Sequence, residues 1–145
     1  MDWKDNILQT GEQIQALFEN TKRIAVLGIK TEQQSSQPAF YVAEYMAKAG
    51  FEIIPVPVYY PEAVTILGQK VYRNLRDVPG EIDLVNVFRR PADITQHVED
   101  ILAKKPKAVW FQLGIRNDEA ARTLAENGIK VVQDLCLMVE HRYAK

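Results

Sequence analysis

Arg23-Ile24-Ala25-Val26-Leu27-Gly28-Ile29-Lys30 is the segment from which the architecture of this chain can be worked out. Ile24 to Leu27 form a short, continuous apolar run, typical of a strand buried on both faces of a parallel sheet. The run stops at Gly28, a polar loop follows from Thr31 to Gln37, and Pro38 begins a segment with helical apolar spacing. Strand, glycine, polar loop and helix make up the first half of a βαβ nucleotide-binding unit. We therefore expect a ligand at the carboxyl end of this strand.

The rest of the chain repeats this alternation of apolar runs and amphipathic segments. Further strands are predicted at 51–56, 82–88, 108–113 and 129–132, and helices at 39–49, at 91–103 and from a cap at Asn117 or Asp118 to Asn127. A helix over 5–19, with Gly11 in its middle, is expected to lie on the sheet as part of an N-terminal segment, 1–21. Shorter pieces are expected at 68–72 (extended), 75–79 (a turn or brief helix) and 135–141 (a short helix). The pattern predicts an α/β, Rossmann-like, doubly wound fold with a mainly parallel five-stranded sheet and helices on both faces.

Composition limits the kinds of function to consider. The 145 residues suit one domain, 1–145, and a net charge of −1 argues against a broad nucleic-acid surface. The sequence has no apolar run near the roughly 20 residues that span a bilayer, so no membrane partner is expected. Cys136 is the only cysteine, which excludes an intrachain disulfide and a cysteine-rich zinc site. We expect a cytoplasmic protein without a metal centre.

Binding of NAD is disfavoured by the loop after the first strand. A dinucleotide site needs a G-x-G-x-x-G loop and an acidic residue about 20 positions further on. Only Gly28 of such a loop is present, and the second strand ends in Pro55-Val56-Pro57-Val58 with no carboxylate at its tip. The ATP-binding pattern G-x-x-x-x-G-K-[ST] is also missing.

The same edge of the predicted sheet is suited to an anion. Loop amides and a helix N-terminus, for which Ser35 or Ser36 is the expected cap, present N–H groups and a partial positive charge. Cations follow three of the strand tips, and guanidinium groups suit bidentate phosphate contacts. We therefore favour a binding site for a ligand with several phosphates over the alternative, that these cations are unrelated, solvated surface side chains. The four cations expected at this edge are Lys30, Arg89, Arg90 and Arg116.

Several sequence blocks resemble the small stand-alone CoA-binding proteins, which are related to the CoA-binding domain of the succinyl-CoA synthetase α subunit. The most specific blocks are Val87-Phe88-Arg89-Arg90-Pro91 and Trp110-Phe111-Gln112-Leu113-Gly114. The likeness runs from about Arg23 to His141. It implies a Rossmann-like CoA site and non-catalytic binding, because the synthetase's catalytic histidine belongs to a separate domain.

The resemblance also implies a role for individual positions. The residues that would face the phosphates are Gly28, Ile29, Lys30 and Thr31, and the pocket helix would open at Pro38. The nucleotide would be lined by Val56, Pro57 and Val58, and its end would be contacted by Phe88, Arg89 and Arg90. The pantetheine side would be contacted by Gln112, Gly114 and Asn117.

Three positions depart from the family pattern. Gln37 stands where members often have arginine, Phe40 stands where they often have histidine, and Pro57-Val58 replaces the usual Asn-Pro. The loop from Thr31 to Gln37 is also longer than usual. These changes bear on the affinity for CoA more than on the fold.

A catalytic alternative rests on Asp134, Cys136 and His141. A nucleophilic cysteine would need an exposed thiol, a depressed pKa and His141 within hydrogen-bond reach. A cysteine packed among Leu135 and Leu137 is the favoured interpretation, because free cysteine is among the most buried residue types. Two hypotheses follow. The first is a non-enzymatic protein that binds CoA or acyl-CoA for sensing, delivery or regulation of a partner. The alternative is an NAD(P)-binding or redox-active domain that uses Cys136.

Overall fold

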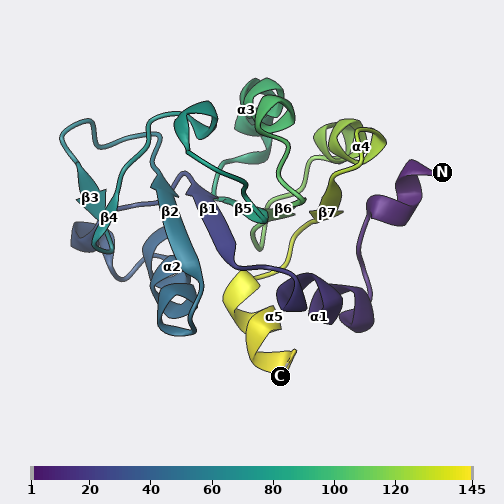
Figure 1. The fold of residues 1–145 in the computed structure, drawn as a ribbon, viewed down its shortest axis with the longest axis horizontal. Helices are drawn as coiled ribbons and strands as arrows, with labels where there is room; N and C mark the ends of the chain where they lie inside the picture. Colours follow the sequence, from purple (N-terminus) through teal and green to yellow (C-terminus); the bar gives the residue numbers. More distant parts are fainter. Residues whose placement is uncertain (1, 145) are drawn as a thin grey trace.

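In a computed structural model, which describes residues 2–144, the chain forms a parallel sheet of five strands (Figure 1). The strand order is β2-β1-β5-β6-β7, and every neighbouring pair is parallel. This confirms the predicted fold class. The carboxyl ends of the strands lie together along one side of the sheet, which we call the carboxyl edge. The strands are β1 (Arg23–Leu27), β2 (Glu52–Val56), β5 (Leu84–Val87), β6 (Ala108–Phe111) and β7 (Lys130–Val132).

Helices cover both faces of the sheet, as predicted (Figure 1). Successive strand residues point to opposite faces, so each strand contributes to two hydrophobic clusters. Trp110 belongs to the cluster beneath α1 (Gly11–Glu19), α2 (Pro38–Lys48) and α5 (Leu137–Tyr143). Phe111 belongs to the cluster beneath α3 (Pro91–Lys104) and α4 (Asp118–Glu126). Within residues 2–144 the helices are too short or too polar to cross a bilayer.

The N-terminal segment differs from the single helix predicted over 5–19. A 3-10 helix, η1 (Trp3–Asn6), is followed by extended chain in which Ile7 bridges to Val131 in parallel. Leu8 N donates to Val131 O at 2.9 Å, so this segment covers the outer edge of β7. Helix α1 begins only at Gly11, because Thr10 and Gln13 form a capping box there. The apolar pattern was helical, but Ile7 and Leu8 add to the sheet instead.

The outer edge of β2 is also covered. The predicted extended piece at 68–72 is part of a small antiparallel hairpin, β3 (Thr65–Ile66) and β4 (Gln69–Lys70). Tyr72 N donates to Pro55 O at 3.0 Å, which ties the chain after the hairpin to β2. Two 3-10 helices complete the connections, η2 (Glu32–Gln34) and η3 (Leu75–Asp77), the latter within the turn predicted at 75–79.

Candidate functional site

Gly28 ends β1 with a positive φ of 88°. A Cβ atom at this position would lie 2.4 Å from Phe88 O and 3.3 Å from Arg89 Cδ. Because glycine has no Cβ, the ends of β1 and β5 can approach closely here. On the other side, Gly28 N donates to Val56 O at 2.9 Å and holds the end of β1 beside the end of β2. This close approach brings together the loops that follow three strands.

The first hollow at the carboxyl edge has a volume of about 370 Å³. It lies between the start of α2, the start of α3 and the loop after β6. Six residues predicted to bind the ligand line it together: Lys30, Pro38, Phe88, Arg89, Arg90 and Gly114. The remaining lining residues are Gln37, Ala39, Pro91 and Ile115. The structure thus brings cations from β1 and β5 to one place.

Two helix N-termini open onto the first hollow. Both α2 and α3 begin with proline, and their N-cap residues are Gln37 and Arg90. Neither N-cap side chain accepts a hydrogen bond from a backbone N–H of the first turn, whereas the side chains of Thr10 and Asn117 do so at the starts of α1 and α4. Neither Ser35 nor Ser36 is the N-cap of α2, because the loop makes a further 3-10 turn before the helix starts. Both N-termini leave partial positive charge facing the hollow.

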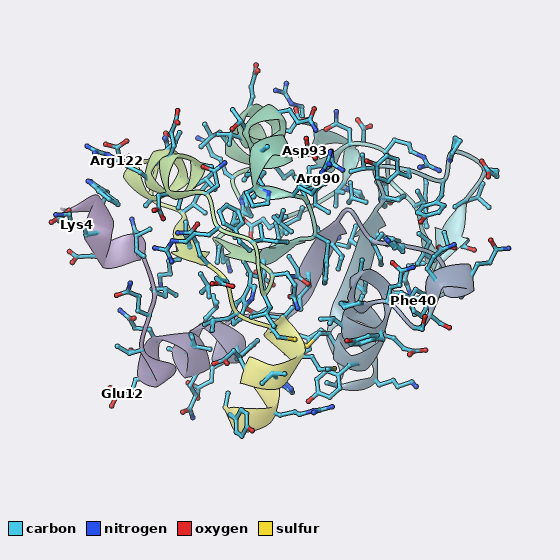
Figure 2. The ribbon with its side chains drawn as sticks, turned by 180° about the vertical axis from the view of Figure 1, so that it is seen from behind. Lys4, Glu12, Phe40, Arg90, Asp93 and Arg122 are labelled. Carbon is cyan, nitrogen blue, oxygen red and sulfur yellow. The ribbon has the colours of Figure 1, made fainter. Side chains whose placement is uncertain are left out.

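The two adjacent arginines have different environments. Arg90 is 83% exposed, and its Nε lies 2.9 Å from Asp93 Oδ2 at the start of α3 (Figure 2). Arg89 is only 9% exposed. Its Nη1 is 3.4 Å from the Tyr59 hydroxyl and its Nη2 is 3.9 Å from Asp93 Oδ2. Arg90 is therefore accessible to a ligand although it is paired with Asp93, while Arg89 is enclosed by its neighbours.

His97, on α3, is a member of this cluster that was not among the site residues predicted from the sequence. Arg89 Nε donates to His97 Nε2 at 3.1 Å, so the imidazole accepts and is neutral in this arrangement. Burial, and then the nearby Arg89 guanidinium, lower the pKa of His97 below its ordinary value of 6.5. The signal was available in the sequence: His97 follows Ile94 by three residues and precedes Ile101 by four, which puts it on the buried side of α3.

A second hollow, of about 170 Å³, lies on the other side of Arg89. The predicted nucleotide residues Val56, Pro57 and Val58 line it, together with His97, which joins it to Arg89. Its other lining residues are Leu27, Arg73, Asn74, Leu75 and Asp100. Thr31 lies apart from these, in a third hollow of about 370 Å³ beside Tyr60 and Glu62.

Three predicted site residues serve the framework instead of lining these hollows. The Ile29 side chain is buried in the core at 1% exposure. Gln112 is 4% exposed, and its Oε1 accepts from Asn86 Nδ2 and Leu137 N, each at 3.3 Å. Asn117 caps α4 and donates through Nδ2 to Pro91 O at 3.0 Å. Gln112 is buried and hydrogen-bonded to other elements, and Asn117 is hydrogen-bonded between α4 and the start of α3. These contacts explain why the two side chains do not line the first hollow.

Arg116 does not join the other three predicted cations. Its Nε pairs with Asp118 Oδ1 at 3.0 Å, and it lines a separate hollow beside Trp3 and the N-terminal segment. In Figure 2, Lys4 and Arg122, which line that same hollow, lie well away from Arg90. The expected convergence of four cations is therefore a convergence of three.

The residues of the proposed nucleophile group are engaged in packing and bracing. Asp134 Oδ1 accepts from Gly114 N at 2.6 Å, and His141 Nδ1 lies 2.9 Å from the Tyr45 hydroxyl. Cys136 is partly buried, precedes α5 and packs on the hydrophobic cluster beneath that helix. Over residues 2–144, His, Cys, Asp and Glu side chains form no group that could hold a metal ion.

Comparison with known proteins shows what the chain is similar to. Residues 22–142 match the family described as CoA binding domain. The uncharacterized protein YneT of Bacillus subtilis (strain 168) is 37% identical over 133 residues, which cover 92% of this chain and 95% of that protein.

Solved structures show the same fold. The Thermus thermophilus protein cell-free ID.343 is 35% identical and superposes with a TM-score of 0.86, covering 94% of this chain and 100% of that chain. A hypothetical protein from Pyrococcus horikoshii OT3 is 31% identical, with a TM-score of 0.84 over 94% of this chain and 92% of that chain. At 17% identity, dinucleotide forming acetyl-coenzyme A synthetase 1 of Ca. Korarchaeum cryptofilum shares the fold alone, with a TM-score of 0.66 over 84% of this chain and 27% of that chain.

Proposed function

The chain belongs to the CoA binding domain family, and on that premise we propose that it binds CoA or an acyl-CoA at the carboxyl edge of its sheet. One observation carries the proposal. The N-termini of α2 and α3, left uncapped by Gln37 and Arg90, meet Lys30 in the first hollow. The positive ends of the two helix dipoles, the Lys30 ammonium group and the exposed Arg90 guanidinium group suit a ligand with several phosphates.

The two hollows suit different parts of such a ligand. The phosphates would lie near Lys30 and Arg90. The nucleotide would extend toward Val56 to Val58 in the second hollow, where the β2 tip has no carboxylate to select an NAD ribose. The pantetheine arm would follow the apolar wall that Phe88 and Ile115 give the first hollow.

Within this proposal the protein carries no reaction of its own. Its role would be to sense or deliver an acyl-CoA, or to regulate a partner enzyme according to the CoA that it holds. Support comes from the bracing contacts of Asp134 and His141 and from the packing of Cys136, which give these residues a structural use. Resistance of Cys136 to thiol labelling in the folded protein is the expected result, and rapid labelling would favour the redox alternative.

Calorimetric titration with CoA tests the proposal, with Arg90→Ala as the variant of choice. Because Arg90 is exposed, its removal should leave the fold intact and remove a charge-assisted phosphate contact. Such a contact contributes about 1.5–3 kcal/mol, so the dissociation constant for CoA should rise roughly tenfold or more. Arg122→Ala is the matched control, because Arg122 lies on α4 and lines the separate hollow beside Trp3. This variant should bind CoA like the wild type.

Parallel titrations with NAD and ATP complete the test. Selective binding of CoA that weakens as salt is added is the expected outcome, since phosphate contacts are screened. Equal affinity of the wild type and Arg90→Ala would reject this placement of the phosphates. Tighter binding of NAD than of CoA would reject the CoA assignment and favour the NAD(P) alternative.

A further inference from the structure

Tyr59 is an exposed aromatic side chain at the carboxyl edge that has no role in the packing of the core. Its exposure is 61%, and it directly follows Val58 of the second hollow. Its hydroxyl meets Arg89, which lines the first hollow, and its carbonyl oxygen is bonded by Arg73, which lines the second. The ring lines neither hollow itself, but its neighbours connect it to both.

The backbone beneath this ring is fixed by a single guanidinium group. Arg73 Nη1 donates to Tyr59 O at 3.1 Å, and Arg73 Nη2 donates to Tyr60 O at 2.7 Å and to Ala63 O at 2.8 Å. Tyr60 has a positive φ of 64°, which three carbonyl contacts of this kind hold in place. These hydrogen bonds restrain the exposed loop after β2.

The ring itself is also restrained. The Arg89 guanidinium carbon lies 5.7 Å from the Tyr59 ring centroid, and Tyr60 meets the ring edge-on with centroids 6.5 Å apart and an interplanar angle of 88°. An apolar surface that is both exposed and pre-ordered loses little conformational freedom when a ligand covers it. Rigid aromatic side chains of this kind are typical anchors for flat ligand groups.

We propose that the Tyr59 ring is the stacking surface for the purine base of the bound nucleotide. This inference rests on the proposed CoA-binding function and deepens it. A purine has a large π-face, and stacking on an aromatic side chain holds a base without reading its hydrogen-bonding edge. The ring's place beside Val58 matches the second hollow, and the phosphates then reach Arg90 on the other side of Arg89.

Three variants and two ligands test this inference by calorimetry. Tyr59→Ala removes the ring and should raise the dissociation constant for CoA about tenfold, within the range for the loss of one base–aromatic stack. Tyr59→Phe keeps the ring and loses only the hydroxyl contact to Arg89, so its affinity should stay close to that of the wild type. Tyr143→Ala removes another exposed aromatic ring, on α5 at 82% exposure, and should change nothing.

The second ligand is 4′-phosphopantetheine, which lacks the base. Its affinity should be the same for the wild type and Tyr59→Ala, because the stacking surface has nothing to hold. If Tyr59→Phe and Tyr59→Ala weakened CoA binding equally, the inference would be overturned, and the role of Tyr59 would be to orient Arg89 through its hydroxyl group. Unchanged CoA affinity in Tyr59→Ala would also overturn it while leaving the CoA function standing. Absence of CoA binding by the wild type would overturn the proposed function and the inference together.

Discussion

Gly28 and Gly128 have similar backbone conformations in very different surroundings. Their φ angles are 88° and 83°, but a Cβ would collide with Phe88 O only at Gly28, since nothing lies within 4 Å at Gly128. Alanine at either position meets the strain of a left-handed conformation, about 1–2 kcal/mol. At Gly28 the collision between strand tips adds roughly 1–3 kcal/mol more.

We expect Gly28→Ala to lower the free energy of unfolding clearly more than Gly128→Ala does. Urea unfolding followed by circular dichroism measures both values. Similar losses in the two variants would show that the strand tips can separate at little cost. The site would then be less tightly built than the described contacts indicate.

His97 provides a pH dependence whose sign follows from its surroundings. Its folded pKa is lowered below 6.5, first by burial and then by Arg89, while Asp100 and Asp93 oppose this shift. Between that folded pKa and 6.5 the unfolded chain binds more protons at this position than the folded chain. The contribution to stability is therefore complete above about pH 6.5 and is lost as the pH falls toward the folded pKa.

The variant His97→Gln should flatten this dependence, because its amide accepts from Arg89 without titrating. Unfolding free energies measured from pH 7 down to pH 5 should fall less steeply than in the wild type. Asp83→Asn is the control. Burial alone would raise the pKa of Asp83, but backbone N–H groups of Arg23 and Lys22, with Lys107, lower it below 3.8. Its contribution is lost only at more acidic pH, so an equal flattening by Asp83→Asn would contradict the assignment to His97.

At the scale of elements, a capping side chain at the start of α2 should raise the folding stability and lower the affinity for CoA. Gln37→Asp would supply a carboxylate that accepts from the first turn and suits the helix dipole, a gain of about 1 kcal/mol in folding stability. The same carboxylate would occupy the N–H groups and repel the phosphates in the first hollow. We expect a more stable protein that binds CoA more weakly, seen by urea unfolding and calorimetry of one sample.

Thr10→Asp provides the matched comparison for that variant. It places the same carboxylate at the N-cap of α1, which does not line the first, second or third hollow. Its affinity for CoA should equal that of the wild type. A similar loss of affinity in both variants would mean that overall charge, and not the start of α2, governs binding.

At the scale of the whole molecule, the sequence was sufficient for the sheet because buried parallel strands leave continuous apolar runs such as Ile24 to Leu27. It failed over 5–10, where Ile7 and Leu8 have helical spacing but pair beside β7, while the rest of the predicted helix is present as α1. That choice depends on an unpaired edge far along the chain, which local periodicity does not report.

The site was predictable where backbone position alone decides it. Lys30 and Arg90 follow strands that end at the same edge, so the fold brings them together. Gln112 and Arg116 also follow a strand tip, but backbone position does not decide the directions of their side chains. Gln112 is turned inward by its hydrogen bonds with Asn86 and Leu137, which are distant in sequence. Arg116 lies in a loop that turns the other way, toward Trp3 and the N-terminal segment. Tyr59 was missed because an exposed aromatic residue in a loop is informative only once its restraint by Arg73 is visible.

The N-terminal segment also has a bearing on the order of folding. Ile7 pairs with Val131, and Asn6 Nδ2 donates to Ala125 O at 2.9 Å across 119 residues of sequence. These contacts close the largest loop within residues 2–144, and we expect them to form late in folding. The first residues of the chain must wait for β7 and α4 before they have a surface to join. Trp3, whose ring centroid lies 4.9 Å from the Arg122 guanidinium carbon, changes its environment when this segment docks and can report that step in refolding kinetics.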